Sequence, residues 1–115
     1  MSSKPVALPV GEALSLESLV AVTPGGIASR ILAKAAGGSV TLFAFDAGQG
    51  LSEHTSPFDA LVVVLVGELG VTVGGAPVVA RPGTLVRLPA GVPHAVDASE
   101  PTRMLLVMLR ETTPA

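Results

Sequence analysis

The chain has 115 residues, a formal net charge of −2 and no cysteine, which predicts one domain without disulfide bonds or thiolate chemistry. It has no run of Lys or Arg that would neutralise phosphate groups, so we expect neither nucleic acid nor a membrane surface as a partner. The N-terminus lacks the basic and then apolar pattern of a signal peptide, and no apolar run is long enough to cross a bilayer, which favours a cytoplasmic protein.

The first 22 residues are expected to form an arm or edge segment, followed by a single β-barrel domain over 23–115. Residues 1–11 carry two prolines and no sustained hydrophobic period, which is typical of an arm or a short edge strand. Residues 12–21 space their leucines in a way that fits one helical turn or a strand equally well. Both alternatives stay open for this segment.

Short strands separated by glycine and proline turns are predicted along the rest of the chain. We expect them over 27–35, 39–46, 61–66, 69–73, 78–80, 84–88, 95–98 and 104–109. The composition of 27–35 also suits a helix, but Gly-Gly pairs bracket it at strand length. Short strands at intervals of roughly ten residues indicate an all-β, antiparallel sandwich or small barrel.

The segment 61–66, with the sequence LVVVLV, is the most apolar of these strands. It is too short to span a bilayer, and its β-branched valines favour an extended, buried strand. It follows a polar loop that contains His54, one of only two histidines in the chain. We therefore expect a site at the mouth or wall of whatever this strand helps to enclose.

Each histidine lies in a block framed by glycine. The first block is GQGLSEHTSPFDALVVVLVG over 48–67 and the second is GTLVRLPAGVPHAVDA over 83–98. Their spacing resembles the paired motifs of the cupin superfamily, G(X)5HXH(X)3-4E(X)6G and G(X)5PXG(X)2H(X)3N. The resemblance implies the cupin fold, an antiparallel jelly-roll barrel also called a double-stranded β-helix.

The resemblance also implies a depleted metal site. In metal-binding cupins the two histidines and the glutamate of the first motif, with the histidine of the second, hold a divalent ion. His54 and His94 match the first and last of these ligands, whereas Ser56 and Ala60 occupy the other two positions. The expectation is no metal, or a weakly bound Fe, Mn, Ni or Zn ion on His54 and His94.

Asp59 is a candidate third metal ligand. In a regular strand it has the opposite parity to Ala60 and faces away from the histidines. Pro57 is a position at which a bulge can reverse that parity and bring the carboxylate inward. The simpler interpretation of Asp59 is a turn residue or a cap.

A ligand pocket is predicted around five residues: His54, Ser56, Ala60, His94 and Met104. A single buried histidine more often bonds to the backbone than to a ligand. However, both histidines match positions of the paired motifs, which favours a shared pocket. Met104 lies on the last strand, where it fills space or makes the pocket wall apolar and adaptable.

Three functions are consistent with these residues. The preferred hypothesis is binding or sensing of a small organic molecule in an apolar pocket polarised by the two histidines, without metal. The alternative is a metal-dependent cupin enzyme, of the dioxygenase, isomerase or decarboxylase type, with an incomplete protein ligand set. A metal-free sugar epimerase ranks last, because its acid is a tyrosine and the chain contains none. A structural dimer with a vestigial pocket is the simplest alternative to all three.

A homodimer is also expected. Hydrophobic residues make up 49% of the chain, and the mean hydropathy is +0.65, which is high for so small a domain. Small domains have a large surface relative to their volume, so part of this apolar surface is expected to lie against a second copy.

Overall fold

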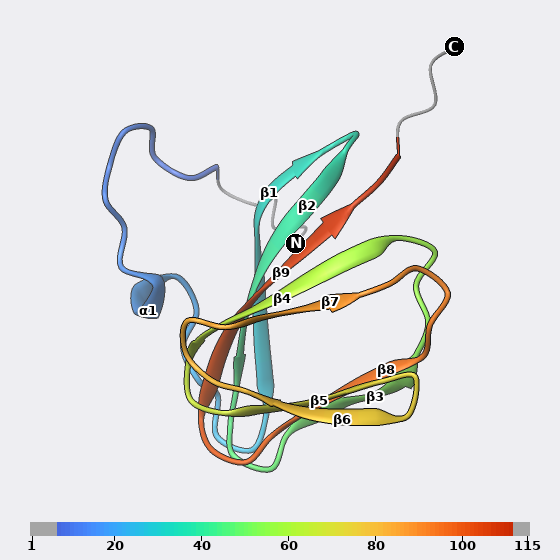
Figure 1. Cartoon of the computed structure of the whole chain (residues 1–115). Coiled ribbons are helices and arrows are strands. Elements are labelled where there is room, and N and C mark those ends of the chain that lie inside the picture. The colour runs from blue at the N-terminus through green and yellow to red at the C-terminus, as the bar shows by residue number, and fades with distance from the viewer. Residues whose placement is uncertain (1–6, 112–115) are drawn as a thin grey trace, which may run out of the picture.

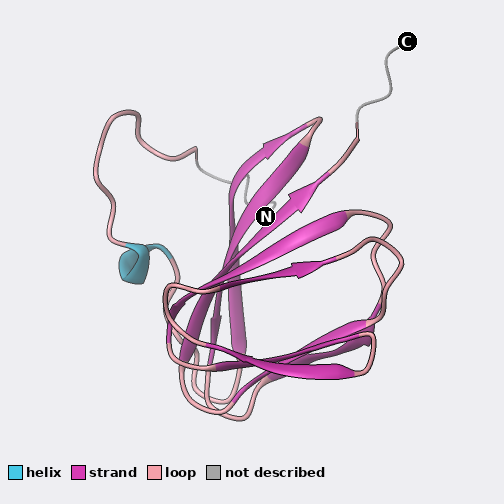
Figure 2. Cartoon of the chain, viewed as in Figure 1, coloured by secondary structure: helices cyan, strands magenta, loops and turns pink. Residues whose placement is uncertain are grey.

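The computed structural model describes residues 7–111 and folds them into nine strands and one short helix (Figures 1 and 2). The elements are α1 (Leu16–Leu19), β1 (Ile27–Ala35), β2 (Gly38–Phe45), β3 (Gly50–His54), β4 (Asp59–Val66), β5 (Leu69–Val73), β6 (Ala76–Ala80), β7 (Leu85–Leu88), β8 (His94–Ala98) and β9 (Thr102–Leu109). The part of the predicted arm over residues 1–6 lies outside the described residues. No helix over 7–111 is long and apolar enough to cross a membrane.

The strands form two antiparallel sheets that face each other. The larger sheet has the order β1-β2-β9-β4-β7 and the smaller has the order β3-β8-β5-β6. Figure 1 shows that the connections β3–β4 and β7–β8 lie on the same side of the molecule, on the right of the view. The predicted all-β, antiparallel jelly-roll barrel is confirmed.

Most predicted strands agree with the structure to within a few residues. The segment 27–35 is β1 rather than a helix, with a register irregularity between Ile31 and Ala33. The open alternative over 12–21 resolves as the one-turn helix α1. One expectation was wrong: His54 does not lie in a loop but ends β3, which was not predicted because GLSEH has little apolar character.

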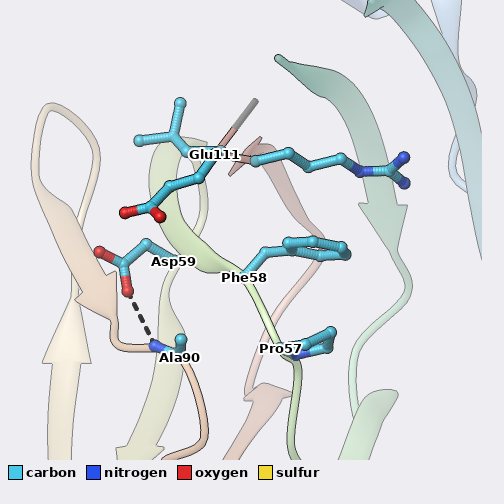
Figure 3. Close-up of a pocket in the computed structure, with 7 residues that line it drawn as sticks. Pro57, Phe58, Asp59, Ala90 and Glu111 are labelled. Carbon is cyan, nitrogen blue, oxygen red and sulfur yellow. Dashed lines mark hydrogen bonds between the residues drawn. The ribbon is translucent and has the colours of Figure 1, made fainter. Parts of the chain in front are cut away.

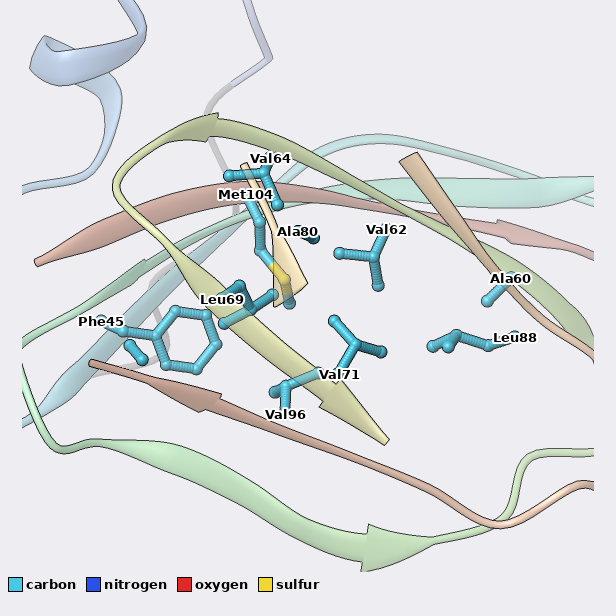
Figure 4. Packing of buried hydrophobic residues seen from close by; sticks show 11 residues of the cluster. Phe45, Ala60, Val62, Val64, Leu69, Val71, Ala80, Leu88, Val96 and Met104 are labelled. Atoms are coloured by element: carbon cyan, nitrogen blue, oxygen red, sulfur yellow. The ribbon is translucent and has the colours of Figure 1, made fainter. Parts of the chain in front are cut away.

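Apolar side chains from both sheets fill the space between the sheets (Figure 4). This core cluster consists of Phe45, Ala60, Val62, Val64, Leu69, Val71, Ala80, Leu88, Val96, Ala98 and Met104. None of these side chains is more than 5% exposed. Alternate residues of β4 point into the core, as the period of two in a strand requires.

The prediction that 61–66 is a buried strand holds for one face of β4 only. Val62 and Val64 are fully buried, whereas Leu61 and Val63 are half-buried on the outer face of the larger sheet. A second apolar cluster covers one end of this outer face, where Val20 packs with Leu42 and Ala44. The chain after α1 therefore shields part of the outer face, and the rest of that face stays accessible.

Gly67, which closes the first histidine block, is required by its surroundings. Its φ is +89°, a conformation that residues with a side chain rarely adopt. A Cβ at this position would collide with the carbonyl oxygen of Pro101 and with Thr102. This close approach fixes the β4–β5 turn against the start of β9 and gives a structural reason for the glycine of the motif.

Candidate functional site

The two histidines meet because their strands are neighbours. β3 pairs with β8 in the smaller sheet, and the register places His54 opposite His94 after an irregularity between Leu51 and His54. The Nε2 atoms of the two rings lie 3.1 Å apart, and the ring planes are inclined at 74°. Side chains forty positions apart in the sequence are thereby in direct contact.

The strand register places these rings at one end of the barrel. His94 lies opposite Val73 on β5, so that Val73, His94 and His54 form a row across three strands. The preceding row of the same face, Val71 with Val96, belongs to the core. His94 is buried, at 6% exposed, whereas His54 is exposed to solvent. The histidine row therefore forms the rim of the barrel interior.

Backbone carbonyl groups fix the orientation of both rings. The Nδ1 atom of His54 lies 2.7 Å from the carbonyl oxygen of Ser52, and that of His94 lies 3.2 Å from the carbonyl oxygen of Val92. A carbonyl oxygen can only accept, so each Nδ1 carries the proton when its bond is formed. Both Nε2 lone pairs then point at each other. Their 3.1 Å contact requires a proton on one of them.

The backbone contacts of the two rings differ in length. The His54 Nδ1 contact with Ser52 is 2.7 Å and the His94 Nδ1 contact with Val92 is 3.2 Å. Which ring donates in the Nε2 contact depends on the tautomers of the two rings.

Ser56 and Asp59 are occupied in holding the rim loops. The Ser56 hydroxyl accepts the Phe58 amide proton at 3.2 Å, and the Ser56 carbonyl accepts the Gly91 amide proton at 2.8 Å. The Asp59 carboxylate accepts the Ala90 amide proton at 2.8 Å and pairs with the Arg87 guanidinium at 3.0 Å. The Ala90 amide, followed by the Arg87 guanidinium, lowers the pKa of Asp59. These bonds tie the loop before β4 to the loop before β8.

The remaining predicted pocket residues lie in the core. Ala60 is 2% exposed and Met104 is 1% exposed, and both pack in the cluster between the sheets. The structure thus brings His54 and His94 together at the rim and places Ala60 and Met104 among apolar side chains. It also places Asp59, whose parity is opposite to that of Ala60, in contact with Arg87 and Ala90.

A surface depression of about 440 Å³, which the sequence did not indicate, lies beside the rim loops (Figure 3). It is lined by Pro57, Phe58, Asp59, Ala90, Leu109, Arg110 and Glu111. The Arg110 guanidinium lies 4.8 Å from the centre of the Phe58 ring, a cation–π arrangement. Phe58 is half-buried, and its contact with Arg110 lies at the wall of the depression.

The residues present do not fit a resident metal ion. One feature does match a metal site: each Nδ1 atom lies on a backbone carbonyl and leaves Nε2 free to act as a ligand, as is usual for metal-ligating histidines. However, a catalytic zinc site takes three protein ligands, and a non-haem iron site adds a carboxylate to two imidazoles. Within 7–111 there is no grouping of three or more His, Cys, Asp or Glu side chains that could hold an ion.

Comparisons with known proteins agree with this architecture. The model of the cupin domain family matches residues 41–108. A conserved protein of unknown function from Streptococcus pyogenes is 30% identical, with a TM-score of 0.87 over 97% of this chain and 98% of that chain. A cupin superfamily protein from Desulfitobacterium hafniense is 27% identical, with a TM-score of 0.85 over 95% and 100% of the two chains.

A third similar structure belongs to a longer protein. The Cupin 2 conserved barrel domain protein from Leptotrichia buccalis is 36% identical, with a TM-score of 0.80, over 84% of this chain and 47% of that chain. No functionally curated protein matches the sequence significantly. The comparisons therefore concern the fold and the family and name no reaction for the three structures described.

Proposed function

This chain belongs to the cupin family, and we propose that it binds a small organic molecule at the paired imidazoles of His54 and His94, without a resident metal ion. The observation that carries this proposal is the 3.1 Å contact between the two Nε2 atoms. One ring of the pair is buried and the other is exposed, so the pair is held rigidly and can still be reached from solvent.

The hydrogen bonds of the rings favour an acidic ligand. With the Nδ1 protons held by backbone carbonyls, any proton that the pair takes up resides at Nε2, where the rings face each other. A pair that takes up one proton carries a single positive charge and presents an Nε2–H donor. Carboxylates accept such charge-assisted hydrogen bonds well. Small organic acids are therefore the proposed ligand class.

The neighbours of the pair favour a ligand with an apolar part. Val73 lies directly opposite His94 in the strand register and is half-buried, and Leu51 packs against the core from β3. A ligand carboxylate on the imidazoles would bring its hydrocarbon portion next to this apolar edge of the core. Burial of that portion supplies affinity, and the imidazoles supply orientation.

The second candidate function is that of a metal-dependent cupin enzyme. The convergence of two Nε2 atoms whose Nδ1 partners are backbone carbonyls favours it, because metal-binding histidines are oriented in the same way. The missing donors would then have to come from the substrate itself. We assign no reaction step to this candidate.

Chelator-treated protein titrated with acetate, benzoate and malonate tests the first candidate. We expect at least one of these acids to shift the imidazole ¹⁵N and ¹H signals of both histidines and to give a saturable isotherm by calorimetry. His54→Gln and His94→Gln should each weaken binding by about tenfold or more, because each removes a charge-assisted hydrogen bond.

Glu53→Gln is the matched control for this titration. Glu53 is the exposed residue next to His54 on β3. The Glu53→Gln variant should bind the acid with the same affinity as the wild type. If none of the acids perturbs either imidazole, or if the histidine variants bind as tightly as the wild type, the proposed ligand class is wrong.

A further inference from the structure

The depression beside the rim loops lies outside the barrel interior. Its lining comes from three segments that are distant in the sequence: the loop before β4, the loop before β8 and the residues that end and follow β9. Neither His54 nor His94 lines it. Asp59, at its edge, has the opposite parity to the core residue Ala60, and Leu109, which lies opposite Asp59 in the register, is 50% exposed. The depression is therefore a second concave region, separate from the histidine row.

Backbone hydrogen bonds hold the walls of the depression in place. The Ala90 amide donates to the Asp59 carboxylate at 2.8 Å, which joins the two loops. The Arg110 amide donates to the Gly37 carbonyl at 2.8 Å, which fixes the chain that leaves β9 against the turn between β1 and β2. A ligand that enters therefore finds the lining already positioned, and the entropic cost of ordering it is reduced.

One side of the depression carries a positive charge. The Arg110 guanidinium lies 4.8 Å from the centre of the Phe58 ring. A guanidinium that stacks through its face keeps the N–H groups at its edge available for hydrogen bonds. The ion pairs within 7–111 are formed by Arg81 and Arg87, and Arg110 belongs to neither. Its N–H groups are thus suited to accept a carboxylate from outside the chain, in the two-pronged geometry that arginine favours.

The other side of the depression carries negative charge. Figure 3 shows the carboxylates of Asp59 and Glu111 on one side, with Phe58 and Pro57 on the other. Glu111 is exposed and belongs to neither ion pair of the described chain. Each oxygen of Asp59 already accepts one hydrogen bond, and a carboxylate oxygen can accept a second. An ammonium group, with three N–H donors, suits this side.

The lining between the two charged sides is apolar. It consists of Pro57, Phe58, Ala90 and Leu109. The volume of about 440 Å³ lies within the range of small-molecule sites, in which apolar groups supply affinity and a few polar groups fix orientation. An α-amino acid carries both of its charges on one carbon atom. A ligand that matches this depression instead carries its two charges at opposite ends of an apolar chain.

We propose that the depression is a second binding site, which takes a small zwitterion of the ω-amino acid class, with its ammonium and carboxylate groups separated by an apolar chain. Arg110 binds the carboxylate, and Glu111 together with Asp59 binds the ammonium group. The hydrocarbon chain packs on the apolar lining beside Phe58. Because the lining includes neither histidine, this site and the imidazole pair can be occupied at the same time.

Titration of the full chain with four matched compounds tests this site, with the NMR signals of the Phe58 ring as the readout. ε-Aminocaproate carries both charges, caproate lacks the ammonium group, hexylamine lacks the carboxylate, and norleucine is the isomer with both charges on one carbon. We expect ε-aminocaproate to give saturable shifts and to bind about tenfold or more tightly than each of the others, because each of them loses a charge-assisted contact. An acid bound at the imidazoles shifts the histidine signals instead, so the two sites are distinguished.

Variants assign the two charged contacts. Arg110→Gln should weaken ε-aminocaproate binding by about tenfold and leave the affinity for hexylamine unchanged, whereas Glu111→Gln should weaken ε-aminocaproate and leave caproate unchanged. Arg81→Gln is the matched control, because Arg81 is an exposed arginine in the turn between β6 and β7 and does not line the depression. The proposal is wrong if ε-aminocaproate leaves the Phe58 signals unchanged, if norleucine binds as tightly, or if Arg110→Gln binds like Arg81→Gln.

Discussion

Two neighbouring rows on the inner face of the smaller sheet differ sharply in character. The row formed by Val71 and Val96 is closed off, with 0% and 5% exposure, and belongs to the core. The next row, two residues further along each strand, holds Val73 and the contacting imidazoles. A shift of one inward position thus changes a packed interior into a polar rim. The interior row therefore contributes packing, and the imidazoles of the proposed binding site lie in the row at the rim.

The same substitution in the two rows should separate these roles. Val71→Ala removes two fully buried methyl groups and should lower the free energy of unfolding by about 2–3 kcal/mol. Val73→Ala, in the half-buried histidine row, should cost about 1 kcal/mol and weaken ligand binding instead. Urea denaturation of both variants measures the difference. Equal losses of stability would mean that the rim is packed as tightly as the core.

Substitution of Asp59, which supports the rim from outside, should change the stability of the fold less than Val71→Ala does. Its pKa is lowered in the folded state, chiefly by the Ala90 amide and then by Arg87, below the ordinary value of 3.8. Its contribution to stability is therefore fully present above about pH 4 and is lost as the pH falls through the folded pKa. In Asp59→Asn, the melting temperature should fall less steeply than in the wild type between about pH 5 and pH 2.

Asp46 provides the control for this pH series. Its pKa is also lowered, by the amides of Gly25 and Ala47, but it supports the turn before β1 rather than the rim. Asp59→Asn should shift the imidazole signals of His94, because Asp59 holds the loop whose Val92 carbonyl accepts from that ring. Asp46→Asn should leave those signals unchanged. If the His94 imidazole signals of Asp59→Asn match those of Asp46→Asn, Asp59 does not position the rim.

The parts of this structure that follow from local sequence were predictable. Hydrophobic alternation and glycine turns located most of the strands. The spacing of the two glycine-framed blocks predicted that His54 and His94 lie in one pocket. β3 escaped prediction because its five residues are mostly polar, and its strand character comes from pairing with β8. Local propensity does not contain that information.

Other features depend on contacts between distant segments. Asp59 and Arg87 are 28 positions apart, and their ion pair exists because β4 and β7 are neighbours. The depression beside Phe58 likewise needs Arg110, which follows β9 directly. The apolar run over 61–66 predicted a buried strand correctly for one face, but only the sheet order shows which side of it is still accessible.

Metal content and ligand binding measured on the same sample test the central claim most directly. Protein incubated with Fe, Mn, Ni and Zn salts and then dialysed should retain less than about 0.1 ion per chain and should bind an organic acid at the imidazole pair. The Ser56→His and Ala60→Glu double variant, which restores the missing ligand types, serves as the positive control and should retain about one ion. Stoichiometric metal in the wild type that is lost in His54→Ala would contradict metal-free binding.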